Sequence, residues 1–300
     1  MTHILTLIAN PDIHALNENL VEDIFKMLPS AGKHVWLSEG EACDIPFSPE
    51  GDQPDLDAVR RAIGSSPIDF VSQRTGVRRK GLLVADMDST IIGQECIDEL
   101  ADFAGLKPKI AAITERAMRG ELEFEPALRE RVGLLEDLDE SVLHKVFAER
   151  ISLNPGARTL VRTMRANGAM TVIVSGGFSF FTGRVAEAAG FDAHQANTLE
   201  FRGGKLAGRV VEPILGKQSK LNALRRYREK LNLTHDQTLA VGDGANDLAM
   251  LMEAGLGVAY HAKPVVAASA HARIDYCDLN ALLFAQGYAR ADFVEDEDTP

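Results

Sequence analysis

Two aspartates two positions apart, Asp86 and Asp88, have the spacing in this sequence that most directly suggests chemistry. They follow residues 81–85, a small and apolar run that is typical of a buried strand. Because side chains alternate faces along an extended segment, the two carboxylates can share one face while Met87 points away. Two acids directed at one space repel each other unless a cation or a proton lies between them. The pattern therefore predicts a functional site at the end of this strand.

Three further features follow along the chain. Ser175 begins a Ser-Gly-Gly run whose hydroxyl and unobstructed N–H groups could bind phosphate oxygens. Lys220 lies on a predicted helix and offers a mobile positive charge for an anion. Asp243 lies in an acid-rich turn, residues 242–247, that enters a helix. Each feature alone has an ordinary explanation as a turn, a surface lysine or a helix cap, so the indication comes from their joint order.

An Asp-x-Asp pair is also compatible with a calcium loop. That alternative lacks the further ligands and the closing glutamate of an EF-hand. The sequence therefore favours a site assembled from several strand ends over a single ion-binding loop.

The elements around these residues alternate strands and helices, which predicts an α/β fold with a doubly wound, Rossmann-like parallel sheet. Its ligands are expected at the carboxyl ends of the strands. The predicted strands are 81–85, 170–174, 239–242, 256–260 and 273–276, the helices are 157–166, 180–189, 219–230, 246–253 and 264–269, and a hairpin pairs 198–201 with 205–211. Residues 94–153 carry only helical periodicity, which predicts a helical cap above that edge.

Residues 1–75 predict a separate small α+β domain with the element order βαββαβ. This order resembles ferredoxin-like domains, including the ACT type that binds amino acids, although a structural or dimerising domain is the favoured interpretation. The basic run 73–80 is expected to be a solvated linker at the boundary. The predicted catalytic core comprises residues 76–93 and 154–290, and residues 291–300 form an acidic tail that we expect to be disordered.

The composition narrows the class of protein. A net charge of −12 over 300 residues argues against non-specific binding to nucleic acid or to an anionic membrane. No apolar run approaches the ~18 residues of a membrane span, and the first residues carry no export signal. Three widely separated cysteines, Cys43, Cys96 and Cys277, predict a reduced, cytoplasmic protein without a structural zinc site.

The four features in this order resemble the motifs of the haloacid-dehalogenase-like phosphohydrolases, and within them of the phosphoserine phosphatases. The resemblance covers residues 81–283, and the cap runs 95–99, 114–118 and 128–132 resemble the phosphoserine-specific cap. It implies hydrolysis of O-phospho-L-serine to L-serine and phosphate through an aspartyl-phosphate intermediate. One Mg²⁺ per active site and a place as the last step of serine biosynthesis are implied as well.

The resemblance also implies roles for the core residues. Asp86 is the expected nucleophile, and Asp88 protonates the departing serine oxygen and then deprotonates the attacking water. The implied Mg²⁺ ligands are Asp86, the backbone carbonyl of Asp88, and Asp243. Related ATPases that preserve their aspartyl-phosphate carry threonine two positions after the nucleophile, so the aspartate here favours hydrolysis. Phosphate contacts are implied for Lys220, Ser175 and Gly176, and outer positions that orient Lys220 and the metal's waters for Asn246 and Asp247.

Substrate choice is expected to come from the cap. Glu95 would bind the ammonium group of the substrate, and Arg131 would bind its carboxylate with two hydrogen bonds. Met118 and Phe124 are candidates for an apolar wall that excludes water, although apolar residues on a cap helix are more often core. Cys96 is expected to be a packed side chain.

Two alternatives stay open at this level. The same core could act on another small phosphomonoester, or transfer phosphate to an alcohol. The chain could also be an amino-acid-binding regulator without activity, although an intact set of Asp86, Asp88, Lys220 and Asp243 argues against it. We expect a small-molecule substrate, no nucleic-acid or membrane partner, and a possible homodimer.

Overall fold

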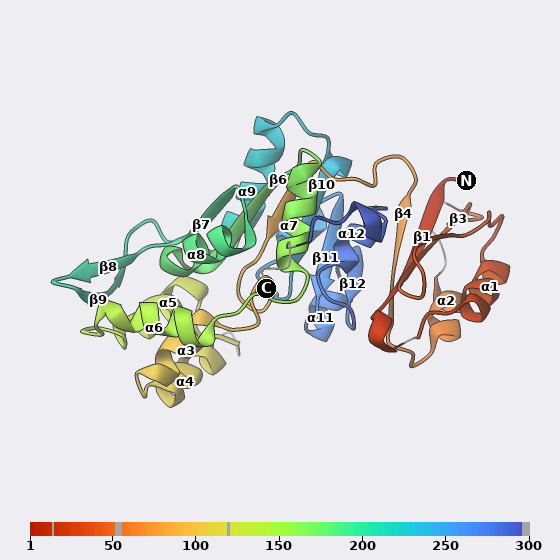
Figure 1. The fold of residues 1–300 in the computed structure, drawn as a ribbon. Coiled ribbons are helices and arrows are strands. Elements are labelled where there is room, and N and C mark those ends of the chain that lie inside the picture. The colour runs from red at the N-terminus through yellow and green to blue at the C-terminus, as the bar shows by residue number, and fades with distance from the viewer. Residues whose placement is uncertain (14, 52–55, 119–120, 296–300) are drawn as a thin grey trace.

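The computed structural model describes residues 1–13, 15–51, 56–118 and 121–295 of the chain. An antiparallel sheet formed by the N-terminal residues lies at one end of the molecule (Figure 1). A six-stranded parallel sheet occupies the middle, and a block of helices lies at the other end. Within the described residues, no helix is long and apolar enough to cross a membrane.

The central sheet has the strand order β12-β11-β10-β5-β6-β7, and all of its neighbours pair in parallel. Its strands are β5 (Leu82–Ala85), β6 (Met170–Phe178), β7 (Ala193–Asn197), β10 (Thr238–Gly242), β11 (Leu256–Tyr260) and β12 (Ala272–Ile274). Strand β5 lies between β10 and β6, with Ala85 opposite both Val241 and Ile173. The predicted doubly wound sheet is therefore confirmed, and the residues that follow these three strands meet at one edge.

Both faces of this sheet are covered by helices, which explains why β5 is apolar throughout. Leu83 and Ala85 belong to a buried cluster with α7 (Ala157–Ala166), α8 (Ser179–Ala189) and α12 (Ala281–Ala285). Leu82 and Val84 point to the opposite face and pack with α9 (Gln218–Lys230), α10 (Leu248–Glu253) and α11 (Pro264–Ala267).

The structure differs from the sequence-based expectation at three elements. Strand β6 continues through Ser175 to Phe178, where a turn was expected, and its register with β7 shifts between Val174 and Phe178. Strand β7 was not predicted, because its sequence Ala-His-Gln-Ala-Asn lacks β-branched and aromatic residues other than the histidine ring. Helix α12 was not predicted either, because five consecutive apolar residues have no helical periodicity.

The helical block corresponds to the predicted cap region. It contains α3 (Cys96–Phe103), α4 (Lys107–Met118), α5 (Phe124–Gly133) and α6 (Glu140–Arg150). The hairpin of β8 (Leu199–Arg202) and β9 (Lys205–Val210) extends from the core and packs against α5 (Figure 1). The two chain segments that join the block to the core are bonded to each other, because Ile92 bridges Leu153 and the Gln94 amide pairs with Ser152.

The N-terminal sheet has the order β2-β3-β1-β4 and is antiparallel throughout. Its elements are β1 (His3–Ala9), a 3-10 turn η1 (Pro11–Ile13), α1 (Glu18–Met27), β2 (Val35–Ser38), β3 (Ala42–Phe47), α2 (Asp57–Ile63) and β4 (Ile68–Arg74). This is the predicted βαββαβ arrangement, with α1 and α2 packed on one face of the sheet. Helix α1 starts at Glu18, because the Asn17 side chain caps it by accepting the Leu20 N–H.

The prediction of a solvated linker over residues 73–80 is wrong for two of its cations, Arg78 and Lys80. Arg78 donates two hydrogen bonds to Asp44, at 2.6 and 3.0 Å, and also reaches the carbonyl of Ala285 in the core. Lys80 is only 6% exposed. The segment is therefore a packed joint between the N-terminal sheet and the core, held by charge that the sequence pattern assigned to solvent.

Two further 3-10 turns complete the named elements. They are η2 (His235–Gln237) and η3 (Arg290–Asp292). The three cysteines are free and buried, in agreement with the expected reduced state.

Candidate active site

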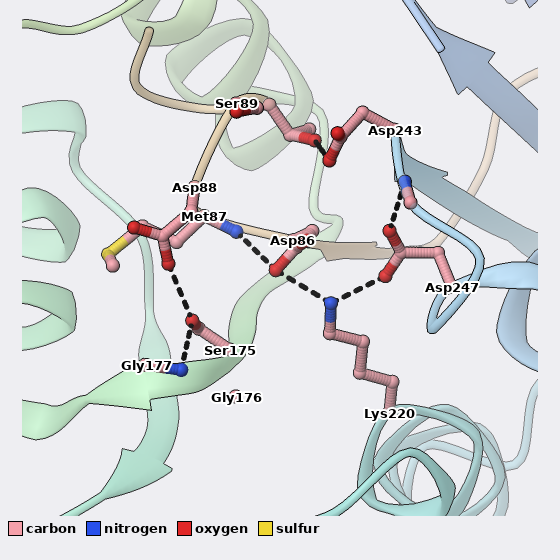
Figure 2. Close-up of polar contacts among 12 residues, drawn as sticks. Asp86, Met87, Asp88, Ser89, Ser175, Gly176, Gly177, Lys220, Asp243 and Asp247 are labelled. Carbon is pink, nitrogen blue, oxygen red and sulfur yellow. Dashed lines mark hydrogen bonds and ion pairs between the residues drawn. The ribbon is translucent and has the colours of Figure 1, made fainter. Parts of the chain in front are cut away.

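A buried corner at the carboxyl edge of the sheet is formed by Asp86, Lys220 and Asp247. Asp86 follows β5 directly and is 5% exposed, Lys220 comes from α9 and is 3% exposed, and Asp247 is fully buried. The Lys220 ammonium lies 2.7 Å from Asp86 Oδ1 and 2.5 Å from Asp247 Oδ1 (Figure 2). The Met87 N–H also donates to Asp86 Oδ1, at 2.8 Å. The carboxylate of Asp86 is thus held in one orientation by two donors.

The charges in this corner do not balance, because two carboxylates surround one ammonium group. Burial raises the pKa of Asp86 well above its usual value, the negative charge of Asp247 raises it further, and Lys220 opposes both. Burial alone would lower the pKa of Lys220, but the carboxylates of Asp247 and Asp86 outweigh it and raise that pKa. The lysine is therefore charged, and one positive charge faces more than one acid.

A third carboxylate completes a candidate metal site. Asp243 follows β10, and carboxylate oxygens of Asp86, Asp243 and Asp247 lie within 4.8 Å of one another. Burial and the charge of Asp247 raise the pKa of Asp243, and the Thr90 hydroxyl donates to its Oδ1 at 3.3 Å. Three acids against one lysine leave an excess of negative charge that a divalent cation would neutralise. Oxygen-only donors of this kind fit Mg²⁺ better than zinc.

This cluster differs from the expected ligand set at one position. Asp247 was expected at an outer position, yet its carboxylate belongs to the group that surrounds the candidate metal site. The tight turn before Asp247 brings its carboxylate into this group. The Gly244 N–H donates to Asp247 Oδ2 at 3.0 Å, and a side chain at Gly242 would collide with the Asp247 carboxyl group.

Asp88 faces a different neighbourhood from Asp86. Its Oδ2 accepts a hydrogen bond from the Ser175 hydroxyl at 3.0 Å (Figure 2). Its Oδ1 accepts one from the Cys96 N–H at 2.8 Å. Burial raises the pKa of Asp88, while these hydrogen bonds oppose the rise. The extended end of β6 makes this contact possible, because a Cβ at Gly177 would lie 3.0 Å from both Asp88 Oδ2 and Ser175 Oγ.

Two charged residues of the cap face this edge. Glu95 precedes α3, and the Ser89 hydroxyl donates to its Oε1 at 2.7 Å. Desolvation, together with the negative charge of Asp88, raises the pKa of Glu95 to about 7, although the residue is exposed. Arg131, on α5, is half-buried, and burial lowers its pKa while Asp98 and Glu95 raise it. Because the charge of Glu95 raises the pKa of Arg131, these two side chains lie close enough to interact. They place opposite charges on one side of the helical block.

The remaining residues that the sequence singled out lie in different parts of the structure. Phe124 covers the Ser-Gly-Gly segment of β6, since a Cβ at Gly176 would lie 3.0 Å from Phe124 Cζ. The Asn246 side-chain oxygen lies against Gly244 in the acidic turn. Met118 ends α4, and its side chain lies outside the described residues. Cys96 is buried, and burial raises the pKa of its thiol well above the usual value, so it is a packed side chain without a reactive thiolate.

Sequence reasoning gave no role to the two hydroxyl residues that follow Asp88. Ser89 has a φ of +54°, a conformation that few non-glycine residues adopt, and this directs its hydroxyl to Glu95. Thr90 is fully buried and bonds Asp243, while its carbonyl accepts a hydrogen bond from Asn154 at 2.7 Å. Their position immediately after the Asp-x-Asp pair is the sequence feature that could have identified these two residues.

Comparison with known proteins agrees with this geometry. The family model described as haloacid dehalogenase-like hydrolase matches residues 83–252. A phosphoserine phosphatase from Streptomyces coelicolor is 45% identical over 234 residues, which make up 77% of this chain and 57% of that protein. This chain therefore spans little more than half the length of that curated relative.

Two solved structures match nearly the whole chain. A HAD family hydrolase from Salmonella enterica serovar Typhi has a TM-score of 0.83 at 32% identity, over 94% of this chain and 98% of that one. A probable phosphoserine phosphatase from Vibrio cholerae, in unliganded form, has a TM-score of 0.77 at 33% identity, over 97% of this chain and 88% of that one. Both overlaps therefore include residues of the N-terminal sheet.

Proposed function

Because the chain belongs to the haloacid dehalogenase-like hydrolase family, we propose that it hydrolyses O-phospho-L-serine to L-serine and phosphate. The observation that carries the proposal is the pairing of two chemistries at one edge of the sheet. Asp86, held by Lys220, provides a nucleophile for phosphate, and Glu95 with Arg131 provides partners for an ammonium and a carboxylate. The phosphoserine phosphatases among its relatives support this choice of substrate.

In the first chemical step, a carboxylate oxygen of Asp86 attacks phosphorus, and the bond between phosphorus and the serine oxygen breaks. Lys220 and the Met87 N–H orient the attacking carboxylate, and Lys220 offsets negative charge on the phosphoryl group. A Mg²⁺ ion bound by the acid cluster would offset the repulsion between the anionic nucleophile and the phosphate. The product of this step is an aspartyl-phosphate on Asp86.

Proton transfer is assigned to Asp88. Its raised pKa favours a protonated form that can donate to the departing serine oxygen. The resulting carboxylate, stabilised by the Ser175 hydroxyl and the Cys96 N–H, then takes a proton from the water that attacks the aspartyl-phosphate. Phosphorus is released as inorganic phosphate, and the Asp86 carboxylate is regenerated.

The cap supplies selectivity in this proposal. Glu95 binds the substrate ammonium, Arg131 binds its carboxylate, and Phe124 over Gly176 excludes water from the phosphate. We assign residues 94–153 to the cap, residues 76–93 and 154–290 to the core, and residues 1–75 to an ACT-like domain that serves packing or dimerisation. One Mg²⁺ per site, a cytoplasmic location and the last step of serine biosynthesis complete the proposal.

A phosphate-release assay on a panel of phosphomonoesters tests the substrate. We expect release from O-phospho-L-serine to exceed release from a sugar phosphate and from an aryl phosphate. EDTA should abolish release, and added Mg²⁺ should restore it. Faster release from the sugar phosphate would contradict the proposed substrate while leaving the phosphatase chemistry intact, and transfer to an added alcohol in place of water would identify a phosphotransferase.

A further inference from the structure

A second cleft lies at the opposite edge of the central sheet from the catalytic residues. It has a volume of about 1010 Å³ and separates β4 of the N-terminal sheet from the amino ends of the core strands. Lys80 precedes β5, Leu256 begins β11, and His271 precedes β12, and all three line the cleft. The catalytic aspartates follow the carboxyl ends of the same sheet, so the two sites are separated by the length of the strands.

Positively charged side chains outnumber carboxylates among the described lining residues of this cleft, although the whole chain carries a net charge of −12. Its lining includes Arg60, Arg74, Lys80 and Arg273 together with His271. We use the name basic cleft for the site formed by Ser72, Arg74, Lys80 and His271, which come from the N-terminal sheet, the linker and the core.

Two of the three carboxylates among the described lining residues are engaged within the protein. Asp69 accepts backbone N–H bonds from residues 275, 276 and 277, at 2.8, 3.1 and 2.9 Å. Asp275 pairs with Arg273 at 3.0 Å, whereas the Asp236 side chain is exposed, contacts the His235 ring at 3.0 Å and acts on Lys80 through its negative charge. Residues 52–55, which adjoin this region in the sequence, lie outside the described chain and are not counted.

Two donors of the basic cleft, in contrast, have hydrogens that no acceptor within the described residues uses. Lys80 Nζ donates to the carbonyls of Val77 and Asp236, both at 2.8 Å, which uses two of its three hydrogens. Ser72 Oγ is buried and, within the described part of the chain, has no hydrogen-bond partner. A buried cation and a buried hydroxyl in this condition are costly unless a ligand or water satisfies them.

The imidazole of His271 adds a donor of defined position. Its Nδ1 accepts the Gly257 N–H at 3.1 Å, so the neutral ring carries its hydrogen on Nε2. Burial lowers the pKa of His271, and the charge of Lys80 lowers it further. Burial also lowers the pKa of Lys80 to about 8, an effect that Asp236 partly offsets. A bound anion would reverse both effects, because it favours the charged form of each group.

We propose that the basic cleft binds a small, multiply charged oxyanion through Lys80, Arg74, Ser72 and His271. Such an anion accepts the unused hydrogens of Lys80 and Ser72 and bridges the N-terminal sheet to the core. Carboxylate-bearing and phosphate-bearing metabolites share this chemistry, and the cleft volume accommodates either one. The site is separate from the phosphate-binding residues of the proposed reaction and does not depend on that proposal.

NMR of the full-length, magnesium-free protein with labelled histidines tests the site directly. The His271 ring signal is assigned by its loss in His271→Gln and is followed during separate titrations with inorganic phosphate and with succinate at constant ionic strength. We expect a saturable shift for at least one anion. Binding of phosphate alone identifies a phosphate-bearing ligand, and binding of both identifies an oxyanion site of broader choice.

Matched variants separate a built site from general charge attraction. Arg74→Gln should weaken binding about tenfold, because it removes one charge-assisted hydrogen bond. Arg61→Gln removes the same charge from an exposed position of α2 outside the cleft lining and should leave binding unchanged. Lys80→Met should abolish the saturable shift. Ser175→Ala should not alter it, because Ser175 belongs to the catalytic edge.

The proposal is overturned by either of two results. One is a His271 signal that does not move, or that moves linearly without saturation, with both anions. The other is equal weakening by Arg74→Gln and Arg61→Gln, which would mean that only net charge matters. If Lys80→Met fails to fold, the comparison of the two arginine variants still decides the outcome.

Discussion

The two halves of the candidate active site are built differently. The core half consists of Asp86, Lys220 and Asp247, which are nearly inaccessible to solvent and joined by contacts of 2.7 and 2.5 Å. The cap half consists of Glu95, which is exposed and held by one hydroxyl, and Arg131, which is half-buried and bonded to the Ala127 carbonyl at 3.2 Å. The core half is buried and held by short contacts, whereas the cap half keeps charged groups available to a ligand.

The two halves are suited to different parts of the proposed reaction. Fixed charges in a buried corner require little reorganisation during bond breaking, so they suit transition-state stabilisation. Groups with few internal partners lose little when a substrate engages them, so they suit substrate selection. The comparison predicts that changes in the core half reduce kcat, whereas changes in the cap half raise KM and alter selectivity.

Replacement of the nucleophile should have the largest effect. Asp86→Asn should fold, because the amide relieves repulsion from Asp247, and should lower kcat by roughly 10⁴-fold or more on every phosphomonoester. Phosphate release and thermal unfolding, both measured with Mg²⁺ present, check this outcome. Substantial activity in a folded Asp86→Asn protein would mean that another group attacks phosphorus.

Replacement of the proton carrier should have the next largest effect. Asp88→Asn should lower kcat by about 10²–10⁴-fold, the range for loss of a general acid and base. Because Asp88 is also assigned to activate water, the aspartyl-phosphate should persist longer in the variant when an activated aryl phosphate is the substrate. Rapid-quench measurement of acid-stable phosphoprotein tests this. Equal lifetimes in the variant and the parent would remove Asp88 from the second step.

Loss of the cap arginine should act mainly on binding. Arg131→Ala should raise KM for O-phospho-L-serine by about 10–100-fold, the value of one strong charged contact, and should change an aryl phosphate much less. Arg131→Lys keeps the charge but loses the planar pair of donors, so it should fall between the two. An equal loss on both substrates would show that Arg131 does not bind the carboxylate of the substrate.

The smallest effect should come from the ionisation of Glu95. Since burial and Asp88 raise its pKa to about 7, Glu95 is largely protonated below that pH and then cannot pair with an ammonium group. KM for phosphoserine should therefore fall as pH rises through about 7, by several-fold more than KM for an aryl phosphate, which shares only the phosphate titration. Glu95→Gln should remove this extra dependence.

The Ser89 hydroxyl provides a control for the same titration. Its hydrogen bond lowers the pKa of Glu95, so Ser89→Ala should move the pH dependence of KM upward while leaving kcat close to that of the parent. A variant profile that superposes on the parent would separate Ser89 from substrate binding.

Much of the fold was predictable because its signals are local. The apolar run before Asp86 and the alternation of strands and helices predicted the parallel sheet, and helical periodicity over residues 94–153 predicted the helical block of α3, α4, α5 and α6. The strand β7 and the helix α12 were missed, since each depends on neighbours supplied by packing. The extension of β6 through Ser175 also depends on packing, because its glycines leave room for Asp88.

The sequence by itself determined the chemistry that we propose for this protein. Two aspartates at the end of a strand, a serine-glycine segment, a lysine and an acidic turn suffice for phosphate chemistry, because spacing along a chain fixes which groups can share a strand edge. Only the tertiary structure decided that Asp247 joins the candidate metal site, that Lys80 is buried and that Arg78 is half-buried in an ion pair with Asp44. Those outcomes depend on distant segments that enclose a charge, and burial of that kind leaves no periodic signal in the sequence.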